Sequence, residues 1–252
     1  MEWRDEGLIL AGRKFGESGL ILDVLTAGQG RRAGLVHGGA SRRRRAQYEP
    51  GNSLDVSWTG RLEDQLGRFD LAELQVARAA RHLDQPEALA AIAAVTSLLR
   101  ATLDEGDRAG SALYGPSLVL LDALEAEGVW PALYVRWELG LLSSLGFGLD
   151  LSQCALSGAN DGLTHVSPRT GRAVRGSEAG TYLDRLLPLP AFLVQSDAPP
   201  GPDGIARGLE LTGHFLTRRV FHAHNRAIPE ARQRLVDRLV RAGFSGPVER
   251  DP

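Results

Sequence analysis

The first third of the chain has the short hydrophobic pattern of β-strands. Leu54, Val56 and Trp58 alternate with polar residues, as in a strand that buries one face. Other β-rich runs, separated by turns and loops that contain glycine, cover residues 8–14, 19–26, 31–37 and 65–76. Five short strands joined in this way predict a small β-barrel that is closed or nearly closed.

From Asp84 onward, apolar residues recur every three or four positions, which is the pattern of helices. The first apolar stripe comprises Leu89, Ile92, Val95, Leu99 and Leu103. Further helices are predicted over residues 111–127, 130–145, 178–187 and 205–225, and after Pro229. We interpret these stripes as the core of a helical bundle.

Residues 150–180 follow neither period. Gly, Ser, Asn, Asp and Pro punctuate this segment, which is typical of a loop-rich or small β insertion. The sequence therefore predicts an α+β protein with several parts. A five-stranded barrel covers residues 1–80, a helical domain with the insertion covers 81–246, and a flexible tail covers 247–252.

Charge is unevenly distributed along the 252 residues, although the formal net charge is only −2. Residues 62–128 contain twelve acidic residues and five arginines, whereas residues 25–47 contain six arginines and no acidic residue. Lys14 is the only lysine, which fits a coding bias toward arginine. Whatever its origin, the guanidinium group is a planar fork that suits phosphate and stacks on bases.

The densest positive charge follows two glycines, Gly38 and Gly39. A short, bendable segment with unopposed charge is a candidate site for an anionic polymer. The candidate contacts are Arg31, Arg32, Arg42, Arg43, Arg44 and Arg45, with Arg13 and Lys14 at the end of the first predicted strand. The alternative is a solvated basic loop that has no ligand.

Two aromatic residues near these cations are candidate stacking surfaces. Phe15 follows Lys14, and Tyr48 follows the arginine run. Aromatic faces beside cationic side chains are used in sequence-tolerant binding of single strands, where stacking contributes about 1–3 kcal/mol per base. The alternative is that they fill the ends of the barrel. Trp58 lies on the apolar side of its strand, so we expect it in the core.

The long helix predicted over residues 205–225 carries a possible second basic strip. Arg207, His214, Arg218 and His222 follow the 3.6-residue period and therefore share one face. Such a strip suits phosphates or an acidic peptide. An ordinary solvated helix face explains the same pattern.

Recognised catalytic motifs are absent from the sequence. Cys154 and His165 could form a nucleophile and a base, but no third, orienting group stands at a recognisable spacing. His214, His222 and His224 are not spaced to surround one ion. We therefore expect neither enzymatic activity nor a cofactor or metal.

The N-terminus is charged, and no apolar run reaches the ~18 residues that a membrane span requires. Cys154 is the only cysteine, which rules out an internal disulfide framework. These features favour a soluble, cytoplasmic protein without a membrane partner.

The order of motifs in the first fifty residues resembles the N-terminal domain of the RecO family of bacterial recombination mediators. The family pattern is a hydrophobic strand, an aromatic-x-Glu-Ser turn, a Thr-x-x-x-Gly hairpin and a Gly-Ala-basic loop. Here these are residues 8–14, Phe15-Gly16-Glu17-Ser18, Thr26 to Gly30, and Gly39-Ala40 with the arginines. Beyond these residues the likeness rests on the change from strands to helices near residue 80.

The resemblance implies an OB-fold barrel followed by a helical domain. It also implies binding to single- and double-stranded DNA and annealing of complementary strands in DNA repair and recombination. The partners it implies are the acidic tail of single-stranded DNA-binding protein, RecR and, indirectly, the recombinase RecA, with an association to the nucleoid. Two alternatives stay open at this point: an adaptor for acidic peptides and an RNA-binding OB-fold protein.

One departure from the family concerns metal. Many members of the family carry two Cys-x-x-Cys pairs in the insertion, and these bind zinc. In this sequence Cys154 stands at the first pair, Ser157 replaces its second thiol, and residues 174–180 contain no cysteine. One thiolate cannot build a tetrahedral four-ligand site, so we predict that no structural zinc is bound.

Overall fold

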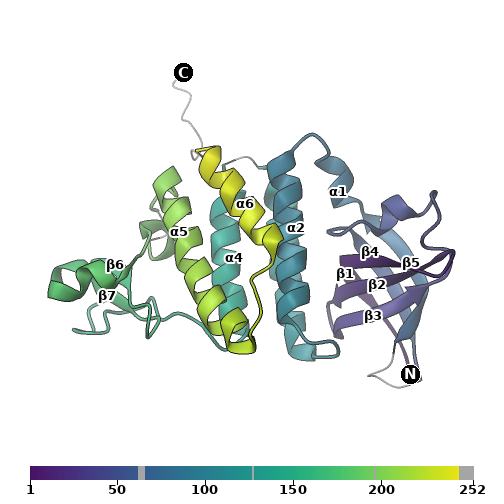
Figure 1. The fold of residues 1–252 in the computed structure, drawn as a ribbon, viewed down its shortest axis with the longest axis horizontal. Coiled ribbons are helices and arrows are strands. Elements are labelled where there is room, and N and C mark those ends of the chain that lie inside the picture. Colours follow the sequence, from purple (N-terminus) through teal and green to yellow (C-terminus); the bar gives the residue numbers. More distant parts are fainter. Residues whose placement is uncertain (62–65, 127, 196, 244–252) are drawn as a thin grey trace. The chain divides into compact units, whose positions relative to one another are not determined.

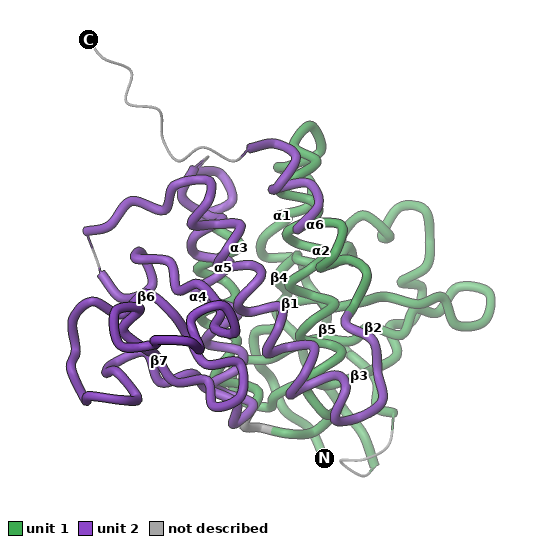
Figure 2. The backbone as a smooth tube through the Cα atoms, turned by 60° about the vertical axis from the view of Figure 1, so that its left-hand side comes forward, with its two compact units in different colours: residues 1–122, 229–235 green, residues 123–228, 236–252 purple. Residues whose placement is uncertain are grey.

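The computed structural model describes residues 1–61, 66–126, 128–195 and 197–243. The chain divides into two compact units, which Figure 2 distinguishes by colour. Unit 1 contains residues 1–122 and 229–235, and unit 2 contains residues 123–228 and 236–252. The tail predicted over 247–252 lies outside the described residues.

Unit 1 contains a closed five-stranded barrel, which confirms the predicted OB-fold (Figure 1). Its strands are β1 (Glu2–Phe15), β2 (Gly19–Thr26), β3 (Gly30–Val36), β4 (Ser53–Thr59) and β5 (Gly67–Val76). Their order is β1-β2-β3-β5-β4, and β4 closes the barrel by pairing with β1. All neighbouring pairs are antiparallel except β3 with β5, which is parallel.

The strand β1 begins six residues earlier than the sequence predicts, at Glu2 rather than Leu8. Its first half pairs with β4, from Glu2 opposite Thr59 to Leu8 opposite Ser53. Its second half pairs with β2, with an irregularity between Ile9 and Ala11. The first half carries charged side chains, so its sequence lacks the apolar signal of a strand.

Trp58 fills the centre of the barrel, as its position on the apolar face of β4 predicts. Its indole Nε1 donates a hydrogen bond of 3.0 Å to the carbonyl oxygen of Ala33, and Trp3 stacks on it with ring centroids 5.5 Å apart. A Cβ added to Gly67 would lie 2.2 Å from the Trp58 ring. Glycine is therefore required where β5 begins, because the backbone passes directly over the indole.

Unit 1 also contains α1 (Arg78–Arg81), α2 (Pro86–Thr102) and α3 (Tyr114–Asp122), and α2 packs on β1. Arg78 joins these parts: its buried guanidinium donates to Asp122 at 2.7 Å and to the Ser53 hydroxyl at 2.6 Å. The helix predicted over 111–127 is α3 flanked by 3-10 turns, with Pro116 in its first turn.

The edge of β3 that β5 leaves unpaired is covered by the loop after α2. The parallel pairing between β3 and β5 involves only Gly34 and Leu35. Farther along β3, the Gly106 amide donates to the Arg31 carbonyl oxygen, and the Ala33 amide donates to the Glu105 carboxylate, both at 2.9 Å. This loop therefore satisfies backbone groups that an open sheet edge would expose.

Unit 2 is built around α4 (Trp130–Ser144) and α5 (Pro202–Phe215), which pack together. The predicted helix over 205–225 is α-helical only to Phe215 and continues as a π-helix (Leu216–Phe221) and a 3-10 turn. The last helix, α6 (Glu230–Arg241), is divided between the two units.

The insertion contributes to a small three-stranded sheet rather than forming loops alone. Its strands β6 (Leu163–Val166) and β7 (Ala173–Arg175) are joined by β8 (Leu187–Pro188), which follows the insertion, in the order β7-β6-β8. The helix predicted over 178–187 is a 3-10 helix (Gly180–Arg185) that leads into β8. Over the described residues, the structure has no helix with the length and apolarity needed to span a membrane.

Candidate nucleic-acid interface

One end of the barrel brings together the β1–β2 turn and the loop between β3 and β4. Phe15 pairs with Gly19 at the end of the hairpin, and Leu20 pairs with Val36 where β3 ends. The Ala40 amide donates to the Ser18 carbonyl oxygen at 3.0 Å, which fixes the loop to the turn. Cations from the end of β1 and from the loop therefore share one rim.

Residues 37–48 form turns that end in a 3-10 helix, Arg45–Tyr48. The amides of Arg44 and Arg45 both donate to the Ser41 carbonyl oxygen at 3.0 Å. Five exposed cations result, which we call the basic rim: Arg13, Lys14, Arg42, Arg43 and Arg45. Within the part of the chain that the structure describes, no acidic side chain pairs with these five.

Arg44 is an anchor for the loop, because its side chain is half-buried and bonded internally. Its Nη2 donates to the Tyr48 hydroxyl at 2.7 Å, and its guanidinium lies 5.6 Å from the centre of the Tyr48 ring. Tyr48 in turn donates to the Ala72 carbonyl oxygen at 3.3 Å. Burial raises the pKa of Tyr48, although the charge and hydrogen bond of Arg44 oppose that shift.

The two aromatic candidates, Phe15 and Tyr48, differ in their exposure to solvent. Tyr48 is only 4% exposed and belongs to the barrel core, so its ring is not a stacking surface. Phe15 is 52% exposed at the tip of the hairpin, directly after Arg13 and Lys14. Phe15 is therefore the aromatic face that accompanies the basic rim.

Arg31 and Arg32 are not part of the basic rim. Arg31 forms two hydrogen bonds of 2.8 Å to the Asp23 carboxylate and a third of 2.8 Å to the Leu103 carbonyl oxygen. Arg32 is only 3% exposed, and its Nε donates to the Gln29 carbonyl oxygen at 3.1 Å. Both side chains are committed to the fold rather than presented to solvent.

A groove of about 350 Å³ crosses the outer face of β1, β2 and β3. Asp23 lies in this groove between two arginines, Arg31 and Arg100, and its Oδ2 accepts from the Arg100 Nε at 3.0 Å. Arg13 belongs both to the groove and to the basic rim. The outer face of strands 2 and 3 is where OB-folds generally bind oligonucleotides.

The second basic strip lies on unit 2. Arg207, Arg218 and His222 are exposed, and His214 is partly buried. Burial and the neighbouring Arg218 lower the pKa of His214, so it is less readily protonated than a free histidine. Because a π-helix begins at Leu216, the regular 3.6-residue spacing does not extend across the strip.

Sequence reasoning missed Arg219 in this region. Its Nη2 donates to the Arg169 carbonyl oxygen at 3.1 Å, and its guanidinium lies 4.7 Å above the Phe215 ring. The π-helix places this side chain against the turn between β6 and β7. A uniform helical period could not have signalled it, although the Arg218-Arg219 pair itself is visible in the sequence.

The structure gives Cys154 and His165 separate partners. The Cys154 thiol donates to Glu178 at 3.3 Å, and the His165 Nδ1 contacts the Thr164 hydroxyl at 2.9 Å. Neither contact forms a nucleophile–base pair. Over the described residues, no three His, Cys, Asp or Glu side chains gather as they would around a metal ion.

The fold and the rim together define an OB-fold protein followed by a helical region. A family model described as "Recombination protein O N terminal" matches residues 1–77, and "Recombination protein O C terminal" matches residues 83–227. A protein of Hyphomonas neptunium named DNA repair protein RecO is 64% identical over 95% of this chain and 98% of its own length. Proteins of the same name from Rhodospirillum centenum and Cereibacter sphaeroides are 48% and 46% identical, each over 96% of this chain and at least 96% of their own lengths.

This chain belongs to the RecO family. The family is one of DNA repair and recombination.

Proposed function

We propose that this protein binds single- and double-stranded DNA through the basic rim and anneals complementary strands. The observation that carries the proposal is the set of five exposed cations at one end of the barrel, without acidic partners among the described residues. Exposed arginines and lysines lose little when they exchange water for phosphate. The adjacent Phe15 adds a face on which a base can stack.

The chemistry of the rim favours contact with the DNA backbone over reading of sequence. Guanidinium groups on a turn-rich loop neutralise phosphates and release counterions, and this binding depends little on base identity. Two strands whose phosphates are partly neutralised repel each other less. Annealing then needs no nucleotide hydrolysis, which agrees with the absence of a phosphate-binding loop from the sequence.

The groove on the outer face of the barrel extends this site. Arg13 links the rim to the groove, so a strand held at the rim can continue over β1, β2 and β3. The Asp23 carboxylate is already neutralised by Arg31 and Arg100, so it repels a phosphate less than a free carboxylate does. The groove lining has three arginines against two acidic residues, Asp23 and Glu105, so its formal charge is positive while Arg31 remains bonded to the fold.

The second basic strip on unit 2 is proposed as a further phosphate contact. The side chains of Arg207, Arg218 and His222 are exposed to solvent. Burial is the main cause of the lowered pKa of His214, and the charges of Arg218 and Arg219 add to it. A second DNA-binding surface on the same chain would help an annealing protein to hold two strands.

The proposed partners follow from membership in the family. They are RecR, the acidic tail of single-stranded DNA-binding protein and, through loading, the recombinase RecA, all at the nucleoid. We also propose the boundaries 1–80 for the DNA-binding domain and 81–246 for the helical domain.

Strand annealing tests the proposal. Complementary oligonucleotides, one carrying a donor and the other an acceptor fluorophore, are mixed with and without the protein, either bare or coated with single-stranded DNA-binding protein. We expect faster annealing on both substrates without added nucleotide. If the protein captures acidic peptides but shifts no oligonucleotide at low salt, it is an adaptor instead. Preference for a matched RNA strand would indicate an RNA-binding protein, because the 2′-hydroxyl is the distinguishing group.

A further inference from the structure

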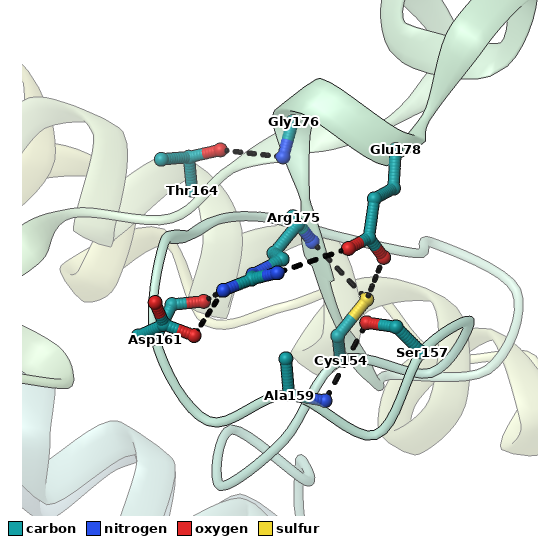
Figure 3. A network of polar contacts seen from close by, with 8 residues as sticks. All are labelled: Cys154, Ser157, Ala159, Asp161, Thr164, Arg175, Gly176 and Glu178. Atoms are coloured by element: carbon teal, nitrogen blue, oxygen red, sulfur yellow. Dashed lines mark hydrogen bonds and ion pairs between the residues drawn. The ribbon is translucent and has the colours of Figure 1, made fainter.

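Two tight turns face each other in the insertion of unit 2. One turn contains Cys154 and Ser157, and the other contains Arg175 and Glu178. Each pair is separated by two residues, and a glycine with a φ of +76°, Gly158, follows the first turn. Figure 3 shows the four side chains converging, with Asp161 on the far side of Arg175. We call these five residues the insertion cluster.

The turns are joined through sulfur and carboxylate. The Cys154 thiol donates to the Glu178 Oε2 at 3.3 Å, and the Arg175 amide donates to the Cys154 sulfur at 3.4 Å. The sulfur is buried, with Cys154 1% exposed. A backbone amide directed at a cysteine sulfur from the opposite turn therefore fixes the two turns to each other.

The guanidinium of Arg175 is the centre of charge in the cluster. Its Nη1 lies 3.2 Å from the Glu178 Oε1, and its Nε donates to the Asp161 carbonyl oxygen at 2.9 Å. Its Nη2 also pairs with the Asp161 carboxylate. The guanidinium thus bonds Glu178 of its own turn and the loop that precedes β6, and Glu178 in turn accepts from Cys154 of the first turn, as Figure 3 shows.

The two charged partners reinforce each other. Hydrogen bonds from Ser157 and Cys154, together with the charge of Arg175, lower the pKa of Glu178 below its ordinary value. Hydrogen bonds from Glu178 and Asp161 raise the pKa of Arg175. The cluster is therefore held in its charged form.

The donor set does not fit the zinc ion that the family resemblance implies for this position. A tetrahedral zinc site takes four lone-pair donors, mostly thiolate or imidazole. The insertion cluster offers one thiol, one hydroxyl and two carboxylates, Glu178 and Asp161, and both carboxylates are already paired with Arg175. The position of the third thiolate is occupied by that guanidinium, which has no lone pair to donate. Its fixed positive charge also repels a divalent cation. The two turns therefore keep the two-residue spacing of the family's Cys-x-x-Cys pairs but do not supply the zinc ligands.

We propose that Arg175 takes the structural role of a metal ion here: as a covalently attached cation it holds Asp161 and Glu178, and through Glu178 it links the second turn to the first. The insertion is then independent of metal supply and of chelators. The network ties together three segments that have little apolar core of their own, namely residues 154–158, the loop at 161 and residues 175–178. This role is separate from DNA binding, since no residue of the cluster belongs to the rim or to the second basic strip.

Hydrogen exchange of the full-length protein tests the cross-link. In Arg175→Met, amides of residues 150–180 are expected to exchange at least about tenfold faster than in the wild type, because the substitution removes the pairs to both Glu178 and Asp161. Arg172→Met is the matched control: its pair with Asp150 joins two exposed side chains at 3.5 Å and is expected to change exchange less than about twofold. Equal effects of the two variants would overturn the proposal.

Metal binding is tested separately. The wild-type protein should contain far less than one equivalent of zinc, and EDTA should leave exchange in residues 150–180 unchanged. Stoichiometric zinc, or faster exchange after EDTA, would overturn the proposal. In the variant Ser157→Cys/Arg175→Cys/Glu178→Cys, added Co²⁺ should give thiolate charge-transfer absorption at one equivalent. A folded variant without that absorption would contradict the equivalence of the two sites.

Discussion

Replacing Arg42, Arg43 and Arg45 together by alanine is expected to weaken the binding of single-stranded DNA by at least about tenfold at low salt. These side chains are exposed and have no acidic partner among the described residues. The substitutions therefore remove phosphate contacts without breaking internal bonds. Arg44 is left in place because it anchors the loop through Tyr48. Fluorescence anisotropy with a labelled oligonucleotide measures the loss.

The matched control removes the same charge elsewhere. Arg4, Arg234 and Arg238 are also exposed, and none belongs to the rim or to the second basic strip. Their joint replacement by alanine lowers the net charge by the same amount. If this control weakens binding as much as the rim variant does, the affinity follows net charge alone and the assignment of the rim is wrong.

Replacing Trp58 by alanine is expected to lower the free energy of unfolding by about 3–5 kcal/mol. The side chain is buried at the centre of the barrel, stacks on Trp3 and donates to Ala33. Gly67 lies so close to the indole that truncation leaves a cavity beside rigid backbone. Urea unfolding monitored by circular dichroism measures the change. A loss below about 1 kcal/mol would show that the barrel does not depend on this packing.

Trp58→Phe is the control for the loss of core volume in Trp58→Ala. Phenylalanine keeps an aromatic ring in the core but loses the hydrogen bond to Ala33. We expect a smaller loss of stability than for alanine. Because the rim is supported by this barrel, Trp58→Ala should also weaken DNA binding, whereas Trp58→Phe should leave binding close to that of the wild type at temperatures where both variants are folded.

The local pattern of the sequence is sufficient for the strands and most helices but not for barrel closure. Alternation in Leu54, Val56 and Trp58 reports only that one face of β4 is buried. Closure depends on pairings between distant strands, β1 with β4 and β3 with β5, and the residues paired with Gly34 and Leu35 are more than thirty positions away. No periodicity encodes such a contact. The prediction of an OB-fold therefore rests on the number of strands and on the likeness of the first fifty residues to a family.

The pattern of charge along the sequence does not distinguish buried arginines from exposed ones. Arg32 and Arg42 look alike in sequence, yet the first packs inside the barrel and the second is exposed. The difference comes from the alternation of β3, which turns Arg32 inward, and from acceptors such as the Gln29 carbonyl oxygen. Tyr48 is a similar case: it is buried, and its hydroxyl forms hydrogen bonds with Arg44 and with the Ala72 carbonyl oxygen.

The insertion is another case in which the sequence does not reveal tertiary contacts. The family resemblance located the first cysteine pair at Cys154 and Ser157 and the expected position of the second within residues 174–180. It did not reveal that Arg175 would bond to both Glu178 and Asp161, because a salt bridge between segments depends on tertiary structure. Likewise the π-helix after Phe215 carries no strong local signal, and it alone positions Arg219.

The most direct test of the central claim is the salt dependence of single-stranded DNA affinity. If the five cations of the basic rim each engage one phosphate, log K should fall with log salt concentration with a slope of roughly −3.5, since each phosphate contributes about −0.7. The variant lacking Arg42, Arg43 and Arg45 should retain a slope of roughly −1.4. A wild-type slope near zero, or the same slope in both proteins, would contradict binding of DNA by the rim.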